Sequence, residues 1–216
     1  MAAGRPLCPP KGLPAPSNPG KRGSTRKRHR PTRRDRDHVD EELKRAAARV
    51  AGGDPAAFRV IVEGTSARLY RVGARMMGST ADAEDVLQDA YVRAFKALSD
   101  GRFDGRSSLS TWLYRIVTNA CLDALRRRKI RPVATAEPPE ASFDGRVGAD
   151  ARVALGELDR WLGDLPPEQR VALVLKSVEG MTSTEIAAVL ECSEGAVEQR
   201  LVRARAALRQ RRSTES

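Results

Sequence analysis

The fold of this chain is decided by residues 179–209, EGMTSTEIAAVLECSEGAVEQRLVRARAALR. Thr182 can cap a helix, and Glu185, three residues later, completes a capping-box pattern. Apolar residues then follow at helical spacing. Cys192 and Ser193 interrupt this run, and Ser193 is a candidate cap for a second helix. The stretch therefore predicts two helices joined by a tight turn.

The second of these helices has one apolar side and one polar, largely basic side. The apolar side is formed by Val197, Leu201, Ala204 and Leu208, which recur at spacings of three and four. The opposite side carries Glu194, Glu198, Gln199, Arg200, Arg203 and Arg205. A short helix, a small turn and a longer basic helix are typical of a helix-turn-helix, whose second helix lies in the DNA major groove. For this segment alone, a solvated pair of amphipathic helices is the alternative.

Composition allows one or two small domains, because 40% of the 216 residues are hydrophobic. The net charge of +11 is concentrated near the N-terminus. Residues 1–37 contain eleven Lys and Arg against two Asp, a net charge of +9, which leaves +2 for the other 179 residues. The basic character is therefore mostly a property of this N-terminal tail.

The tail at residues 1–37 is rich in Pro, Gly and Arg and has almost nothing to bury, so we expect it to be disordered. It lacks the apolar core of a signal peptide. Two interpretations stay open. The tail is a basic arm that adds salt-dependent attraction to nucleic acid, or the true translation start lies further along the chain, near Val39.

Cysteine spacing and hydropathy exclude several classes of protein. Cys8, Cys121 and Cys192 lie far apart without a CxxC pair, so we predict neither a zinc site nor a disulfide framework. No stretch approaches the roughly 18 apolar residues that a membrane helix needs. We therefore expect a cytoplasmic protein with no membrane insertion, no metal and no other cofactor.

Helical periodicity occurs in two blocks. Residues 131–150 between them are rich in Pro, Ala and Gly and lack periodicity, which predicts a linker that spans on the order of 25 Å as a flexible coil. We place the two domains at residues 38–130 and 151–212. No strand pattern is found, so the predicted fold class is all-α, with two small helical domains, a flexible linker and a disordered basic tail.

Three helices are predicted in the first block. Asp54 caps the first, which ends at about Gly78. Ser79 or Thr80 caps the second, whose outer side is largely acidic. The third spans residues 109–129, and its basic C-terminal end suits the helix dipole.

Several motifs occur in a fixed order along these blocks. They are GDPAAF at 53–58, AEDVLQDAYVRAF at 83–95, FDGRSSLSTWLYRIVTNACLD at 103–123, and a segment at 165–208 that begins LPPEQR. In these motifs the chain resembles the extracytoplasmic-function (ECF) group of bacterial RNA polymerase sigma factors, in the sigma-70 family. The resemblance covers residues 40–209, nearly everything outside the tail.

The resemblance implies a role for each motif. The acidic helix docks on the clamp helices of the largest polymerase subunit through Asp85, Gln88, Asp89 and Arg93. The next motif captures a base flipped from the promoter minus-ten element, and the positions involved are Phe103, Asp104, Gly105, Arg106, Ser107, Trp112, Arg115, Asn119, Arg126 and Arg127. The helix-turn-helix recognises the minus-thirty-five element through Ser193, Glu194, Gly195, Ala196, Glu198, Gln199, Arg200 and Arg203.

Two of these positions leave alternatives open. Trp112 packs against the loop before it or faces the point of strand separation, and packing is favoured. Glu198 departs from the family, because many members have Arg or Lys there. A glutamate at this position accepts a hydrogen bond from a cytosine amino group or weakens phosphate affinity.

The resemblance also implies a protein without catalytic residues that is a monomer when free. Its partners would be core RNA polymerase, promoter DNA and an anti-sigma protein that keeps it inactive. One alternative is a helix-turn-helix regulator that acts without polymerase, but such a protein does not need the FDGRSS loop and usually dimerises. The other is a metal-dependent enzyme using Asp82, Asp85 and Asp89, which lacks converging ligands from other helices.

Overall fold

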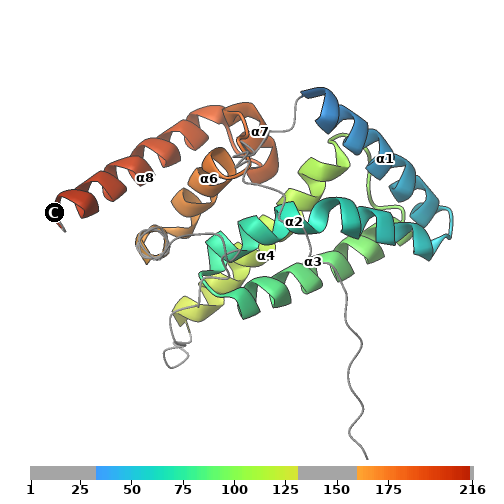
Figure 1. Cartoon of the computed structure of the whole chain (residues 1–216), viewed down its shortest axis with the longest axis horizontal. Coiled ribbons are helices and arrows are strands. Elements are labelled where there is room, and N and C mark those ends of the chain that lie inside the picture. Colours follow the sequence, from blue (N-terminus) through green and yellow to red (C-terminus); the bar gives the residue numbers. More distant parts are fainter. Residues whose placement is uncertain (1–32, 131–159, 215–216) are drawn as a thin grey trace, which may run out of the picture.

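The computed structural model describes residues 33–130 and 160–214. Within these two stretches the chain is helical and contains no β-strand, which confirms the predicted all-α class (Figure 1). Most of the expected tail and the whole predicted linker at 131–150 lie outside the described residues. None of the described helices is both long enough and apolar enough to cross a membrane.

The described helices form two groups. The N-terminal group comprises α1 (Arg33–Ala51), the short 3-10 helix η1 (Pro55–Ala57), α2 (Phe58–Met77), α3 (Thr80–Ser99) and α4 (Leu109–Ile130). The C-terminal group comprises α6 (Pro167–Ser177), α7 (Ser183–Leu190) and α8 (Glu194–Thr214), and residues 160–163 are also helical. Helices α1 to α4 all contact one another, as do α6, α7 and α8.

Local sequence signals begin and end the first helices close to the predicted positions. The Asp54 side chain accepts a hydrogen bond from the Ala56 backbone N–H at 3.1 Å, so the predicted helix starts with a 3-10 turn. Gly78 ends α2 with φ of 64°, in the left-handed region that glycine adopts without strain. The Ser79 hydroxyl then accepts from the Asp82 N–H at 3.3 Å and caps α3.

The helix-turn-helix forms as predicted. The Thr182 N–H donates to Glu185 Oε2 at 2.7 Å, and the Glu185 N–H donates to Thr182 Oγ1 at 3.1 Å, which completes the capping box. The turn passes through Glu191, whose φ of 50° is uncommon for a residue with a side chain. The Ser193 hydroxyl accepts from the Ala196 N–H at 3.2 Å, as expected for the cap of α8.

Helix α1 was not predicted. It begins at Arg33, inside the stretch that the sequence analysis placed in the tail. Its apolar residues Leu43, Ala46, Ala47 and Val50 are buried against the rest of the N-terminal group. Their spacing of three and four is a helical signal. The first residues of α1 are mostly charged, and they masked the helical signal of the apolar residues that follow them.

Helix α4 lies at the centre of the structure. Its inner side buries Leu109, Leu113, Val117 and Ala120. It contacts α1, α2 and α3 in its own group and also α6 and α7 in the other, while α6 contacts α2 as well (Figure 1). The two groups therefore pack against each other, with α4 shared between them.

Substitutions at two neighbouring residues of α8, Leu201 and Val202, test the packing of the C-terminal group. Leu201 is 0% exposed and Val202 is 61% exposed. We expect Leu201→Ala to lower the free energy of unfolding by about 2–5 kcal/mol, because it leaves a cavity. Val202→Ala is the matched control and should change it by less than about 0.5 kcal/mol. Urea unfolding followed by circular dichroism measures both, and equal losses would contradict the packing of α8.

Candidate functional site

One exposed side of α3 carries the four residues that the sequence analysis named as candidate polymerase contacts. Asp85, Gln88, Asp89 and Arg93 are all exposed, at the spacing that places them on one side of the helix. Sequence reasoning thus placed this surface correctly on the outside of the group. The surface carries charged and amide groups that suit a polar, charged partner.

An apolar groove that the sequence analysis missed borders this surface. It has a volume of about 530 Å³ and lies between α2 and α3, and its walls include Phe58, Leu87, Tyr91, Val92 and Phe95. The Phe58 ring meets those of Tyr91 and Phe95 edge-on, at centroid distances of 6.0 and 5.2 Å. The three rings are partly buried, and they pack against the core as well as lining the groove.

Asp85 and Asp89 of this α3 surface, together with Asp82, are the three aspartates of the enzyme alternative, and they also border α4. Asp82, Asp85 and Asp89 line a cavity of about 290 Å³ together with Arg127 and Arg128 of α4. Arg128 forms an ion pair with Asp82 and also donates to the Met77 carbonyl at 3.5 Å. The Asp82 carboxylate is therefore engaged with a guanidinium group. Among the described residues, no group of three or more His, Cys, Asp and Glu side chains is arranged to hold a metal ion.

The loop before α4 is ordered by its own side chains. Asp104 Oδ1 accepts from the Arg106 N–H at 3.1 Å, and Gly105 has φ of 69°, which a turn of this kind favours. The Phe103 ring packs on Trp112, with centroids 5.2 Å apart. Of the two alternatives for Trp112, the structure therefore shows packing against the loop.

Helix α4 presents Asn119, Arg115 and Arg126 at helical spacing on one side. Asn119 is exposed. Arg115 instead donates to the Ala188 carbonyl at 2.8 Å and pairs with Glu191 at 2.9 Å. Arg126 pairs with Asp123 at 3.3 Å and with Glu168 of α6 at 3.6 Å. Two predicted DNA contacts are thus engaged with the C-terminal group, which sequence reasoning did not foresee.

The N-terminal half of α8 is open on its predicted side. Ser193, Glu194, Gly195, Glu198, Gln199 and Arg203 are exposed, and Ala196 and Arg200 are half-buried. Behind them, Val197, Leu201 and Ala204 are buried and fix the helix against α6 and α7. The side chains that face outward are therefore carried on a firmly packed helix.

The structure gives Glu198 a contact within the helix-turn-helix. Its carboxylate accepts a hydrogen bond from the Ser183 hydroxyl, in the first turn of α7. The N-terminus of a helix favours a nearby negative charge, so the site suits a glutamate. Glu198 therefore has a role within the helix-turn-helix. This role is additional to the two effects on DNA binding that its departure from the family suggested.

Arg170 is a buried arginine whose structural role was not predicted from the sequence. Arg170 of α6 is buried and donates to the carbonyls of Met76 at 2.6 Å and Leu165 at 3.3 Å, and also to that of Gly163. Burial lowers the pKa of its guanidinium. The motif LPPEQR therefore contributes a cation that joins α6 to the C-terminal end of α2.

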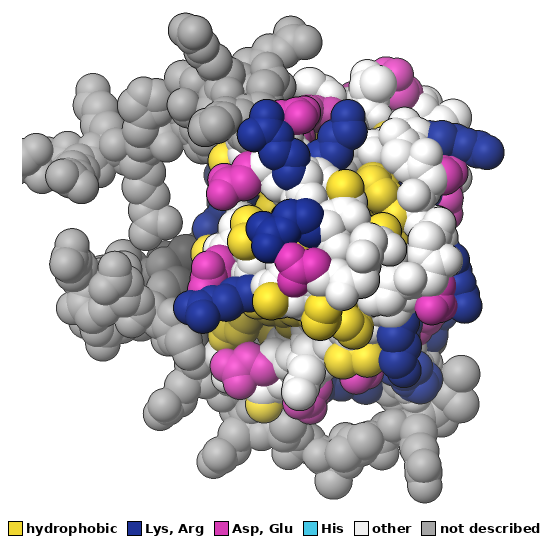
Figure 2. Space-filling view, turned by 90° about the vertical axis from the view of Figure 1, so that its right-hand side faces the viewer, with side chains coloured by type: hydrophobic (Ala, Val, Ile, Leu, Met, Phe, Trp, Pro, Cys, Tyr) yellow, Lys and Arg dark blue, Asp and Glu magenta, His cyan; other side chains and the backbone are white. Residues whose placement is uncertain are grey.

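Charge is mixed on the face of the molecule beside α1. Figure 2 shows Lys and Arg side chains interspersed with Asp and Glu there, with small hydrophobic patches between them. No single basic field covers the described part of that face. The candidate DNA-contacting residues are those of the loop, α4 and α8 described above.

Comparison with known proteins assigns both helical groups to one family. Residues 61–130 match the family model of sigma-70 region 2, and residues 155–208 match that of sigma-70 region 4. The ECF RNA polymerase sigma factor SigM of Mycobacterium tuberculosis is 36% identical over 171 residues, which cover 79% of this chain and 84% of SigM. SigW of Bacillus subtilis is 32% identical over 179 residues, covering 77% of this chain and 95% of SigW.

Solved structures show the same fold. CnrH, solved in complex with the cytosolic domain of CnrY, is 31% identical with a TM-score of 0.61, and the match covers 82% of this chain and 99% of CnrH. The sigma factor RpoE from Bartonella quintana, solved with the anti-sigma factor NepR, has a TM-score of 0.58 at 23% identity, covering 71% and 94%. The chain belongs to the ECF group of sigma-70 RNA polymerase sigma factors, and it directs promoter-specific initiation of transcription through RNA polymerase.

Proposed function

We propose that each of the two helical groups recognises a different element of the promoter. A domain at residues 38–130 binds polymerase and the minus-ten element, and a domain at 151–212 binds the minus-thirty-five element, with 131–150 as the linker. The observation that carries this proposal is the open N-terminal half of α8, where exposed polar residues lie over a buried apolar side. This is the arrangement that a recognition helix needs in the major groove.

The α3 surface is the proposed polymerase site. Asp85, Gln88, Asp89 and Arg93 supply charge and hydrogen bonds, and the adjoining groove supplies apolar area. Charged groups at such a surface orient the partner, whereas a buried apolar contact contributes much of the affinity. A basic helical segment of the polymerase with one apolar side chain directed at the groove fits both features.

The loop at 103–108 and Asn119 of α4 are the proposed minus-ten site. The loop is held by the Asp104 turn and by the Phe103–Trp112 contact, so it is ordered before DNA arrives. A base that leaves the stack loses its stacking energy, and a site that binds the extruded base offsets that cost and favours melting. Arg115 and Arg126 would contact phosphates once they leave their present partners.

Several further properties follow from membership of the family. We propose that the protein is not an enzyme, acts in the cytoplasm, and is a monomer when free. A protein partner that keeps it inactive, an anti-sigma factor, is proposed by analogy with CnrH, whose structure contains a bound partner domain.

Asp89→Lys tests the polymerase site. Reversing an exposed charge at an interface disfavours a basic partner, and we expect the affinity for core polymerase to fall roughly tenfold or more. Glu63→Lys is the matched control, because Glu63 is exposed on α2 and pairs with Arg59 outside the proposed surface. Fluorescence titration with core polymerase measures both. Equal affinities of the two variants would argue against the α3 site.

Arg203→Ala tests the recognition helix. Loss of a base contact costs roughly 1–3 kcal/mol, so holoenzyme carrying this variant should bind its promoter about 5- to 150-fold less tightly. The defect should shrink on a promoter whose minus-thirty-five element is scrambled. Arg209→Ala, an exposed change nearer the end of α8, is the control. A defect that is the same on both promoters would place Arg203 outside base recognition.

Asn119→Ala tests the function as a whole. We expect run-off transcription from a pool of candidate promoters to depend on this protein and core polymerase, and to weaken in the variant. Asn119 is exposed, so the variant should keep its fold. Transcription that is equally strong with the variant and with the wild-type protein would exclude Asn119 from promoter recognition.

A further inference from the structure

The carboxylate of Glu198 is held by the other helix of the helix-turn-helix. Glu198 lies in the second turn of α8, and its Oε1 accepts a hydrogen bond from the Ser183 hydroxyl of α7. Among the residues that the structure describes, Glu198 makes no other hydrogen bond or ion pair. Each oxygen of a carboxylate can accept, so Oε2 remains available to a further donor. One oxygen of Glu198 is thus held in place while the other is open to a partner.

No neighbouring side chain on α8 takes up this second oxygen. The residues one turn away from Glu198 are Glu194 and Gly195 before it and Leu201 and Val202 after it, and none of them is basic. An exposed glutamate on a helix usually pairs with a Lys or Arg three or four residues away. Because Glu198 has no such partner on its helix, its second oxygen can serve a donor from outside the protein.

The backbone on both sides of the contact is firmly fixed. Val197, next to Glu198, and Leu201, one turn later, are both 0% exposed, so this part of α8 is anchored in the core. Ser183 is the first residue of α7, and the capping box at Thr182 fixes that end of the helix. A polar side chain that is supported in this way keeps one orientation. The direction of the Glu198 carboxylate is therefore set before DNA arrives.

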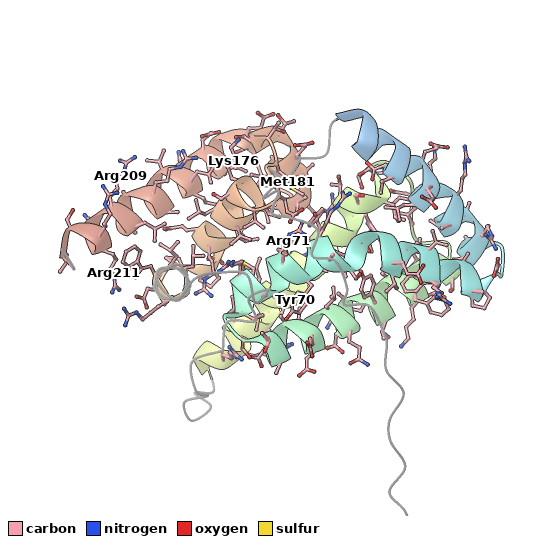
Figure 3. All side chains as sticks on the ribbon, in the orientation of Figure 1. Tyr70, Arg71, Lys176, Met181, Arg209 and Arg211 are labelled. Atoms are coloured by element: carbon pink, nitrogen blue, oxygen red, sulfur yellow. The ribbon has the colours of Figure 1, made fainter. Side chains whose placement is uncertain are left out.

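Glu198 lies on the outer side of α8. In Figure 3, Arg209 of α8 points away from α6. Glu198 precedes Arg209 by eleven residues, which is close to three complete turns of an α-helix, so the two residues share one side. Glu198 is exposed, in the N-terminal half of the helix. It lies where a recognition helix contacts base edges.

A carboxylate in the major groove distinguishes the bases by the donors that they present. Cytosine presents an amino group there, whereas guanine and thymine present acceptors, which repel a carboxylate. Adenine presents an amino group next to the acceptor N7, so it suits a carboxylate less well than cytosine does. The base that best fits the open oxygen of Glu198 is therefore cytosine.

We propose that Glu198 reads a cytosine of the minus-thirty-five element and that Ser183 is the positioning residue that orients its carboxylate. Oε1 keeps its hydrogen bond from Ser183, and Oε2 accepts from the cytosine amino group. Both roles rest on the proposed function, in which α8 lies in the major groove. Of the two effects on DNA binding that the sequence left open for Glu198, the fixed carboxylate favours base recognition over weakened phosphate affinity.

Selection from a randomised promoter tests this proposal on the full chain bound to core polymerase. The probe is a promoter that the protein transcribes, with its minus-thirty-five element randomised, and the fragments that the holoenzyme binds are sequenced. Wild-type protein should enrich cytosine at one position. Glu198→Gln should lower this preference roughly fivefold or more and shift it toward adenine, because an amide both accepts from N6 and donates to N7. Ser183→Ala should lower it roughly two- to tenfold.

Two further variants in the first turn of α7 separate positioning from folding. Ser183→Thr keeps the hydroxyl and should retain the cytosine preference. Thr184→Ala removes a neighbouring, exposed hydroxyl and should leave the preference unchanged. Circular dichroism checks that each variant keeps its helices.

The pattern of base preference decides between the possible results. If Ser183→Ala weakens binding to every sequence by the same factor, Ser183 has only a structural role and the proposal is overturned. A uniform rise in binding with Glu198→Gln would also overturn it, because the carboxylate would then act only by repelling phosphates. So would a base other than cytosine at the position that responds to Glu198.

Failure of the proposed function gives a different result. If wild-type protein enriches no base anywhere in the randomised element, α8 does not read the minus-thirty-five element, and both proposals are overturned together. If wild-type protein enriches an element whose base preferences are the same in Glu198→Gln and Ser183→Ala, only the roles of Glu198 and Ser183 are overturned.

Discussion

The structure depends on the burial of one side of α4. Leu113 and Val117 on that side pack among α1, α2 and α3, and this packing fixes how the rest of the helix faces outward. The loop that precedes α4 and the exposed Asn119 are positioned by it, and α6 and α7 pack against it from the other group. A single helix therefore serves as core, as proposed DNA surface and as interdomain contact.

Much of this fold follows from sequence because its determinants are local. The capping box at Thr182 depends on residues three apart, and the end of α2 depends on one glycine, so each is visible in a short window. Helix α1 has apolar residues at helical spacing, but its first turns are mostly charged, and this composition masked the periodicity. The exposed side of α3 was predicted because its charged residues share one side of an amphipathic helix.

The candidate site was predicted less completely, because its missed features depend on contacts between distant residues. Nothing local in the sequence indicates that Arg115 meets Glu191, or that Glu179 meets Tyr114, since these pairs are 76 and 65 residues apart. The Ser183 contact of Glu198 joins two helices across the turn. Such pairings decide whether a charged side chain is available to DNA, so residue type alone predicts a role without predicting its accessibility.

The central claim is that one protein chain places α4 and α8 on two separate promoter elements. Photocrosslinking in the complex with polymerase and promoter tests it most directly, with a photoreactive amino acid replacing Asn119 in one sample and Arg203 in another. The account predicts crosslinks centred about 25 base pairs apart, from Asn119 within the minus-ten element and from Arg203 within the minus-thirty-five element. Crosslinks from both positions within one turn of the same DNA, or crosslinks that form equally well without polymerase, would contradict it.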